Sequence, residues 1–347
     1  MGLLIVIALP AVAFKVGQTG TVNAVPYVIY NSTYGLYYGV IGKAKNIIGQ
    51  EESMTLSAFL IANGGNGANF VLSLPDDNYR HGKKYNLAFD LLGNLGYTIS
   101  ERFYGLGSET PGSNYTTLNN NHSKYILQFS RSRKDRLILE GDLFFAGNQF
   151  SNIVQGVNPI TPQIEANCRN YVGGSLKLTL DGRDQSLDPH AGFLMINEID
   201  FGLKTADYIK GSVDLRGYST PFRPDQILAS RLMLTQSGGP VIPIYEYAFL
   251  GGRDTMRGYT MNRWRDRSAA LVNLEYRFPL IWQWFQAVVF YEVGKVGDRL
   301  VALGGDSWAS DYGFGLHLNL GGNVVVRGDF GRGTEGANAY FFYNQAF

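Results

Sequence analysis

The sequence predicts an all-β protein, a transmembrane antiparallel β-barrel of about sixteen strands. Three observations support this fold class: apolar and polar residues alternate along most of the chain, no apolar run after residue 14 is long enough for a spanning helix, and few charges are combined with many aromatic residues. A chain without spanning helices satisfies its backbone in a membrane only by closing a barrel.

The composition suits a sheet with one apolar face. Charged residues make up 17% of the 347 residues, below the ~25% of ordinary soluble domains, and 22 Tyr and 21 Phe are enough to form aromatic girdles. The net charge of +1 argues against a nucleic-acid partner. The single cysteine, Cys168, excludes an intramolecular disulfide and a cysteine-based zinc site. Composition alone leaves a soluble β-sandwich open.

The N-terminus resembles an export signal. A short apolar run over residues 3–14 contains the cleavage pattern Ala11-Val12-Ala13, so residues 1–13 are expected to be a signal peptide and 20–347 the barrel domain. No Lys or Arg precedes Leu3, which departs from the usual leader and suggests an incomplete one. The alternative is a buried N-terminal strand.

Strands are predicted where the alternation has period two, because successive side chains of a strand point to opposite faces. Met54, Leu56 and Leu60, for example, alternate with Ser53, Thr55 and Ser57. Several candidates run for ten residues or more, which favours tilted membrane strands over the shorter strands of globular proteins. Since bacterial barrels have even strand numbers, an N-terminal strand near 22–31 joins the other expected strands at 34–44, 52–63, 66–75, 83–93, 122–133, 136–147, 170–181, 191–203, 206–217, 227–236, 268–279, 285–294, 310–320, 323–331 and 338–347.

The connections differ in length. Short links at 132–135 and 319–323 suit periplasmic turns, and longer ones near 100–121, 148–169, 237–267 and 297–309 suit outer loops. The C-terminal residues Phe341, Tyr343 and Phe347 place aromatic side chains in a pattern similar to the outer-membrane insertion signal, although Gln345 departs from it.

Four segments of the chain carry motifs that occur together in one family of proteins. Gly251 to Tyr259 is similar to the family's inward-folded loop, whose core is V-R-G-[FY], with Met256 in place of Val. Asn273 to Pro279 resembles the N-x-E-x-R-x-P strand, and Phe290 to Gly294 resembles the F-x-D-x-G strand with Glu for Asp. The fourth segment resembles the family's D-x-R-D…P…G turn, through Asp181, Arg183, Asp184, Pro189 and Gly192.

Together these segments resemble the BamA/TamA-like outer-membrane superfamily, which includes surface antigens. The resemblance implies a loop that folds into the barrel and is anchored there by Arg257, Gly258 and Tyr259. In the family the partner on the wall is the Asp of F-x-D-x-G, so Glu292, with Gly294 beside it, is the expected wall partner. A guanidinium offers two parallel donors to a carboxylate, and Gly permits a tight turn. The alternative is that Arg257 lies in a mobile outer loop and Glu292 is an ordinary lumen charge.

The resemblance further implies an outer-membrane protein of a Gram-negative type that inserts outer-membrane proteins or translocates polypeptides. Its expected surroundings are outer-membrane lipids, and its expected partners are nascent outer-membrane proteins and a periplasmic protein. The periplasmic protein is expected because the sequence shows none of the repeat domains that precede the barrel in the family's insertases. The alternative is a passive pore or surface antigen without insertase activity. No cofactor or metal is expected, and no catalytic residues, because the sequence has neither a G-x-S-x-G elbow nor spaced histidines.

Overall fold

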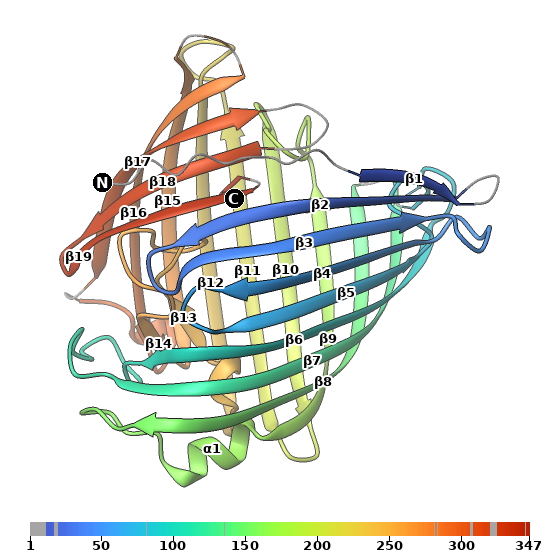
Figure 1. The fold of residues 1–347 in the computed structure, drawn as a ribbon. Helices are drawn as coiled ribbons and strands as arrows, with labels where there is room; N and C mark the ends of the chain where they lie inside the picture. The colour runs from blue at the N-terminus through green and yellow to red at the C-terminus, as the bar shows by residue number, and fades with distance from the viewer. Residues whose placement is uncertain are drawn as a thin grey trace.

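The protein is a closed antiparallel barrel of sixteen strands in a computed structural model, which describes residues 12–16, 20–80, 82–134, 136–280, 282, 284–305, 308–319, 325–343 and 345–347. Figure 1 shows the strands wrapped around a lumen. The ring runs in chain order through β2 (Gly20–Asn31), β3 (Gly35–Lys45), β4 (Ser53–Ile61), β5 (Asn66–Leu74), β6 (Leu87–Phe103), β7 (Thr116–Arg133), β8 (Leu137–Val154), β9 (Asn170–Asp181), β10 (Gly192–Leu203), β11 (Asp207–Ser219), β12 (Ile227–Val241), β15 (Ser268–Pro279), β16 (Phe285–Gly297), β17 (Ala309–Asn319), β18 (Val325–Gly333) and β19 (Gly336–Tyr343).

The distribution of side chains decides between a barrel and a sandwich. In β4 Met54, Leu56 and Leu60 are 51%, 56% and 51% exposed, whereas Ser53 and Ser57, on the opposite face of the strand, are buried. Other strands repeat this arrangement of apolar residues outside and polar residues inside. A soluble sandwich would bury the apolar set instead, so this inverted pattern excludes it and confirms the predicted barrel.

The two ends of the barrel differ. We call the end at which β2 begins and β19 ends the tail end, and the opposite end the loop end. All four long links that the sequence predicted lie at the loop end, over residues 104–115, 155–169, 242–267 and 298–308. They carry the short elements α1 (Pro162–Cys168), η1 (Ile244–Glu246), β13 (Ala248–Leu250), β14 (Trp264–Asp266) and η2 (Leu300–Ala302). The predicted short link at 319–323 lies outside the described residues apart from Asn319, and that at 132–135 lies at the tail end.

Several strands are longer than predicted, most clearly β6, β7, β8 and β12, and others are shorter, including β4 and β19. β6, β7 and β8 continue past the expected residues 93, 122 and 147 toward the loop end. There Phe103 and Leu118 pack on Ile160, Cys168 and Ile244, so an apolar cluster supports the extensions, which alternation within one strand does not reveal. At the other extreme, the predicted strand over 338–347 was wrong beyond Tyr343, where β19 ends.

The ring closes through a short ladder between β19 and β2, which we call the seam. Tyr340 pairs with Asn31 and Phe341 with Tyr30, and the Ser32 amide donates to the Ala339 carbonyl at 3.2 Å. In contrast, β18 and β19 pair along their whole length. The same edge of β2 is met at its start by β1 (Val12–Val16), which pairs from Val12–Ala24 to Val16–Gly20.

The expected signal peptide falls mainly outside the described residues. Residues 1–11 are not described, and Val12 and Ala13 begin β1. No helix among the described residues combines the length and apolar character that a membrane span requires.

Because the outer face of the strands is apolar, a charge placed there should destabilise the barrel in lipid. Leu143→Arg, in the middle of β8 at a side chain 54% exposed, should lower the free energy of unfolding by about 2–4 kcal/mol in phospholipid vesicles, measured by denaturant titration. Val154→Arg, at the loop end of the same strand, is the matched control and should cost less than about 1 kcal/mol. Equal costs at the two positions would contradict the placement of the apolar band.

Candidate functional site: the anchored inner loop

The link between β12 and β15 folds back into the lumen instead of leaving the barrel (Figure 1). Its β13 and β14 pair as a small hairpin around residues 251–263, which we call the inner loop. Gly251 and Gly252 adopt φ of +105° and +106°, a region that favours glycine, and they turn the chain so that the Gly252 amide donates to the Met256 carbonyl at 3.1 Å. Met256 and Leu250 then pack on Leu271 and Val296 of the wall.

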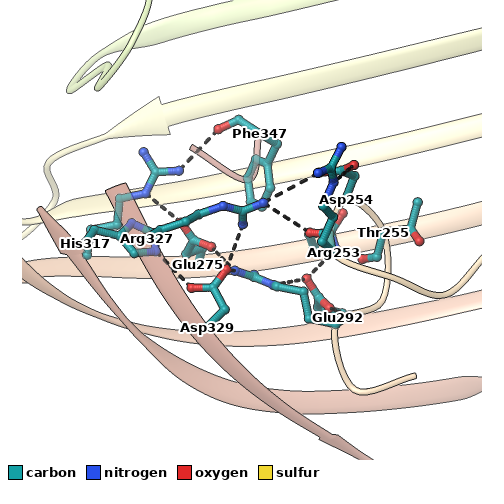
Figure 2. A network of polar contacts seen from close by, with 12 residues as sticks. Arg253, Asp254, Thr255, Glu275, Glu292, His317, Arg327, Asp329 and Phe347 are labelled. Carbon is teal, nitrogen blue, oxygen red and sulfur yellow. Dashed lines mark hydrogen bonds and ion pairs between the residues drawn. The ribbon is translucent and has the colours of Figure 1, made fainter. Parts of the chain in front are cut away.

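Arg257 is fully buried and lies between carboxylates of three strands. Its Nε is 2.9 Å from Glu292 Oε1 on β16, and its Nη1 is 2.8 Å from Glu275 Oε2 on β15 and 3.2 Å from Asp329 Oδ2 on β18. The guanidinium carbon sits 3.5 Å from the centre of the Phe290 ring. Figure 2 shows Glu275, Glu292 and Asp329 gathered around one region of the lumen. The expected contact between Arg257 and Glu292 is therefore present, and two further acids share it.

The electrostatics of this cluster favour the charged arginine. Desolvation by itself would lower the pKa of Arg257, but Glu292, Glu275 and Asp329 outweigh it and hold the pKa above its ordinary value. Other cations balance the additional acids: Arg277 Nε is 2.7 Å from Glu275 Oε1, and Arg327 Nη1 is 2.7 Å from Asp329 Oδ2. His317 Nε2 lies 3.0 Å from the other oxygen of Asp329. The loop thus completes a network in which charges of opposite sign alternate.

Glycines allow the loop backbone to lie directly on the wall. A Cβ added to Gly258 would overlap the Cβ of Asp311 and come within 2.6 Å of the Gly333 amide nitrogen. A Cβ on Gly331 of β18 would be 2.6 Å from the Arg257 carbonyl carbon. A Cβ on Gly294 would be 2.7 Å from Leu250 Cδ1, so this predicted wall residue also lies against the loop segment. Side chains at these positions would push the loop off the wall.

Tyr259 continues the contact toward the seam. Its hydroxyl donates to the Ser310 carbonyl at 2.9 Å, and its ring packs edge-on against Trp264 with centroids 4.6 Å apart. Its carbonyl accepts from the Tyr340 hydroxyl at 2.9 Å, while Asn338 donates to the Gly258 carbonyl at the same distance. Beyond it, the Met261 amide donates to Thr33 Oγ1 at 3.3 Å in the link between β2 and β3. The inner loop therefore contacts both sides of the seam.

Comparison with known proteins identifies the family. A family model described as the Omp85 superfamily domain matches residues 46–332, most of the chain. The chain belongs to the Omp85 superfamily. No curated protein matches the sequence.

Solved structures similar to this Omp85 barrel share its fold at low sequence identity. BamA from Haemophilus ducreyi lacking POTRA domains 1–3 superposes with a TM-score of 0.64 at 14% identity, over 98% of this chain and 75% of that chain. CdiB from Acinetobacter baumannii gives 0.62 at 18% identity, over 94% and 59% of the two chains, and CdiB from Escherichia coli gives 0.63 at 12%, over 93% and 62%. The chain thus spans about three-fifths of the length of either CdiB chain.

Several residues of the site in this Omp85 barrel were not predicted as partners of Arg257. Glu275 and Asn273 belong to the N-x-E-x-R-x-P segment, which the sequence had identified but not connected with the loop; Asn273 donates to both Glu292 Oε1 and the Thr255 carbonyl. Asp329 of β18 is a third such residue, and it is also buried. Its link to Arg257 could not be read from the sequence, because only the barrel's curvature brings β18 opposite the loop.

The predicted turn motif forms the tail-end link at residues 182–191. Arg183 Nη2 is 2.6 Å from Asp181 Oδ2, and Asp184 Oδ1 accepts the His190 amide at 3.0 Å. Gly192 has φ of +103°, and a Cβ there would overlap the Gly182 carbonyl oxygen. Pro189 is buried at the turn. These residues stabilise the turn itself and do not contact the inner loop.

The predicted insertion-signal residues are divided. Phe341 lies in β19 at the seam, and the backbone of Tyr343 ends that strand. Phe347 instead turns into the lumen, where it packs on Tyr218 and Ala229, and Arg277 donates to its backbone oxygen at 3.2 Å. Gln345, the residue that departs from the signal pattern, donates to Asp188 Oδ1 at 3.1 Å. Their role as an insertion signal stays a prediction.

Removing the anchor should destabilise the barrel, because it leaves three buried acids without their common cation. Arg257→Ala should lower the free energy of unfolding by about 3–5 kcal/mol, measured by denaturant titration in vesicles. The control is Arg267→Ala, since Arg267 forms an exposed pair with Asp298 at 3.7 Å; it should cost less than about 1 kcal/mol. Similar losses in both variants would mean that Arg257 is not the anchor.

The tight approach at Gly258 gives a second test that leaves all charges in place. Gly258→Ala should overpack the contact with β17 and β18 at a cost of about 1–3 kcal/mol, so amide hydrogen exchange over residues 251–263 should accelerate roughly 5- to 150-fold. In Gly304→Ala the new methyl group meets no atom within 4 Å, and exchange of the inner loop should not change. Unchanged exchange in Gly258→Ala would show that the loop does not depend on this close approach.

Proposed function

We propose that this Omp85 barrel resides in the outer membrane of a Gram-negative type of cell, where it assembles outer-membrane proteins or translocates polypeptides without enzymatic chemistry. The observation that carries the proposal is the seam, which rests on the pairs Tyr340–Asn31 and Phe341–Tyr30. A strand edge presents amide and carbonyl groups that can template an incoming strand. The shortest ladder of the ring is therefore the place where a client strand or a polypeptide meets the least resistance.

The location in a membrane is supported by the apolar outer face and by family membership. Leucines and aromatic residues cover the outside of the strands, while the lumen holds the charges. Family resemblance supports nascent outer-membrane proteins as clients. It also supports a separate periplasmic partner.

The inner loop supports the same proposal. It contacts β19 through Asn338 and Tyr340 and the β2–β3 link through Thr33, so its position is coupled to the seam. Because a buried ion network holds the loop in one position, opening of the seam would have to move the loop away from that position.

A passive pore is the second candidate, and one observation favours it. A cavity of about 490 Å³ is lined by residues of the barrel such as Tyr37, Asn120 and Lys124 and by Met261 of the inner loop. Water and ions could occupy this space. The two candidates differ in whether opening of the seam is required.

Locking the seam tests the proposal. In Tyr30→Cys/Phe341→Cys, a disulfide would join β2 and β19 where they are directly paired. With the barrel in phosphatidylcholine vesicles, folding of an unfolded client barrel should be faster than in protein-free vesicles. Oxidation should abolish this acceleration, and reduction should restore it. Burial raises the pKa of the native Cys168 thiol to about 11, so this thiol stays protonated and does not exchange at neutral pH.

The control is a crosslink that leaves the seam free. Tyr38→Cys/Leu60→Cys joins β3 and β4, which pair along the whole of β4, and its oxidation should not change the acceleration. Ion conductance without any acceleration of client folding would instead support the passive pore.

A further inference from the structure

A groove at the tail end is lined by residues that have no part in the proposed function. It measures about 470 Å³ and lies where β7 turns into β8, beside the link that precedes β6. Its lining combines the cations Arg131, Arg133 and Lys134 with Leu137 and Leu139.

The cations belong to the outer face of the barrel. Along β7, Leu127 and Phe129 are 41% and 60% exposed, and Arg131 and Arg133 continue the same outward series, while Ser130 and Ser132 point inward and are buried. The apolar band on β7 therefore ends between Phe129 and Arg131. The arginines stand at the border where hydrocarbon meets headgroups.

Arg131 is surrounded by apolar residues of the neighbouring strands. It pairs directly with Leu87 on β6 and with Leu139 on β8, and both leucines are more than half exposed. Arg133 pairs in the same way with Leu137. Directly paired residues of an antiparallel sheet have side chains on the same face about 5 Å apart. Each guanidinium is thus flanked by leucines that face acyl chains.

No carboxylate of the described residues neutralises these cations. Among the described acids near the groove, Asp77 lies 3.7 Å from Arg80, Asp90 is 2.8 Å from Arg80, and Glu51 is 2.6 Å from Lys84. Within the described part of the chain, no ion pair involves Arg131, Arg133 or Lys134. A charge at the edge of hydrocarbon is costly unless it meets an anion or water.

We propose that this groove binds one anionic glycerophospholipid, with the phosphate between Arg131, Arg133 and Lys134 and the acyl chains along Leu87, Leu137 and Leu139. Basic pockets at the membrane surface bind lipid phosphates, and leucines beside them supply the complement to the chains. Long loops face the cell exterior in outer-membrane barrels, so the tail end faces the periplasm and meets the phospholipid leaflet. The proposal rests on the membrane location in the proposed function but not on its client.

Lipid binding by the full chain tests the site. The protein is purified in neutral detergent and titrated with palmitoyl-oleoyl-phosphatidylglycerol, and native mass spectrometry reports the affinity of the first bound lipid. Each cation near an anionic headgroup contributes about fivefold, so Arg131→Gln/Arg133→Gln should weaken binding about 25-fold. Arg131→Lys/Arg133→Lys should retain most of the affinity, because it preserves the charge.

A matched control removes the same number of exposed charges elsewhere. Arg223→Gln/Arg299→Gln should leave phosphatidylglycerol binding unchanged, since both arginines are exposed on links far from the groove in sequence. Phosphatidylcholine should bind the native protein and the glutamine variant of the groove equally weakly. If lipopolysaccharide displaced phosphatidylglycerol, the assignment of the ligand as a glycerophospholipid would be wrong. If all variants bound phosphatidylglycerol with equal affinity, the groove would not be the binding site.

The assay separates this proposal from the proposed function. Client folding is measured in phosphatidylcholine vesicles, where no anionic lipid is present, and lipid binding is measured without a client. If the native protein does not prefer phosphatidylglycerol but still accelerates client folding, only the groove is refuted. If it prefers phosphatidylglycerol but does not accelerate client folding, only the assembly function is refuted. Cooperative unfolding in denaturant verifies that each variant is folded.

Discussion

A β-strand in hydrocarbon has no water to satisfy the polar groups of its edge, and this requirement for closure governs the rest of the structure. It explains why the chain forms a complete ring, in which the ladder between β19 and β2 has the fewest paired residues. Side chains compensate there for the short ladder: Ser32 donates to Asn338 at 2.8 Å, and the inner loop reaches Asn338, Tyr340 and Thr33 from inside. Side-chain and loop contacts therefore hold β2 and β19 together at the seam, whereas backbone hydrogen bonds hold the other neighbouring strands together.

The buried charges of the lumen make this support specific. A buried arginine is costly to desolvate, and only good geometry to several acids repays the cost. Arg257 obtains it from Glu275, Glu292 and Asp329, which belong to three different strands. Any shift of the loop along the wall would separate several of these pairs at once, whereas apolar packing would tolerate such a shift. The network thus fixes the register of the loop on the barrel, and the glycines at 258 and 331 fix its depth.

The sequence predicted the parts of the fold that depend on residues close together along the chain. Alternation of Met54, Leu56 and Leu60 with serines identified β4 and its two faces, and a resemblance in short motifs identified Arg257 and Glu292. It could not predict that Asp329 would join them, because pairing across the lumen depends on the closure of the ring and not on spacing along the chain. The path of Phe347 was also missed, since an aromatic residue at every second position fits a strand as well as a tail that turns inward.

The tail limits how far the seam can extend. One step forward along β19 corresponds to one step back along β2, so the register of Phe341 with Tyr30 would bring Phe347 opposite Ala24, the residue that pairs with Val12 of β1. A fully extended tail would therefore close the edge as far as β1. Instead, Phe347 packs inside on Tyr218 and Ala229 and accepts from Arg277, which also pairs with Glu275 of the anchor network. Contacts in the lumen and ladder bonds at the seam exclude each other for Phe347, so the charge network that holds the inner loop also keeps the seam from extending as far as β1.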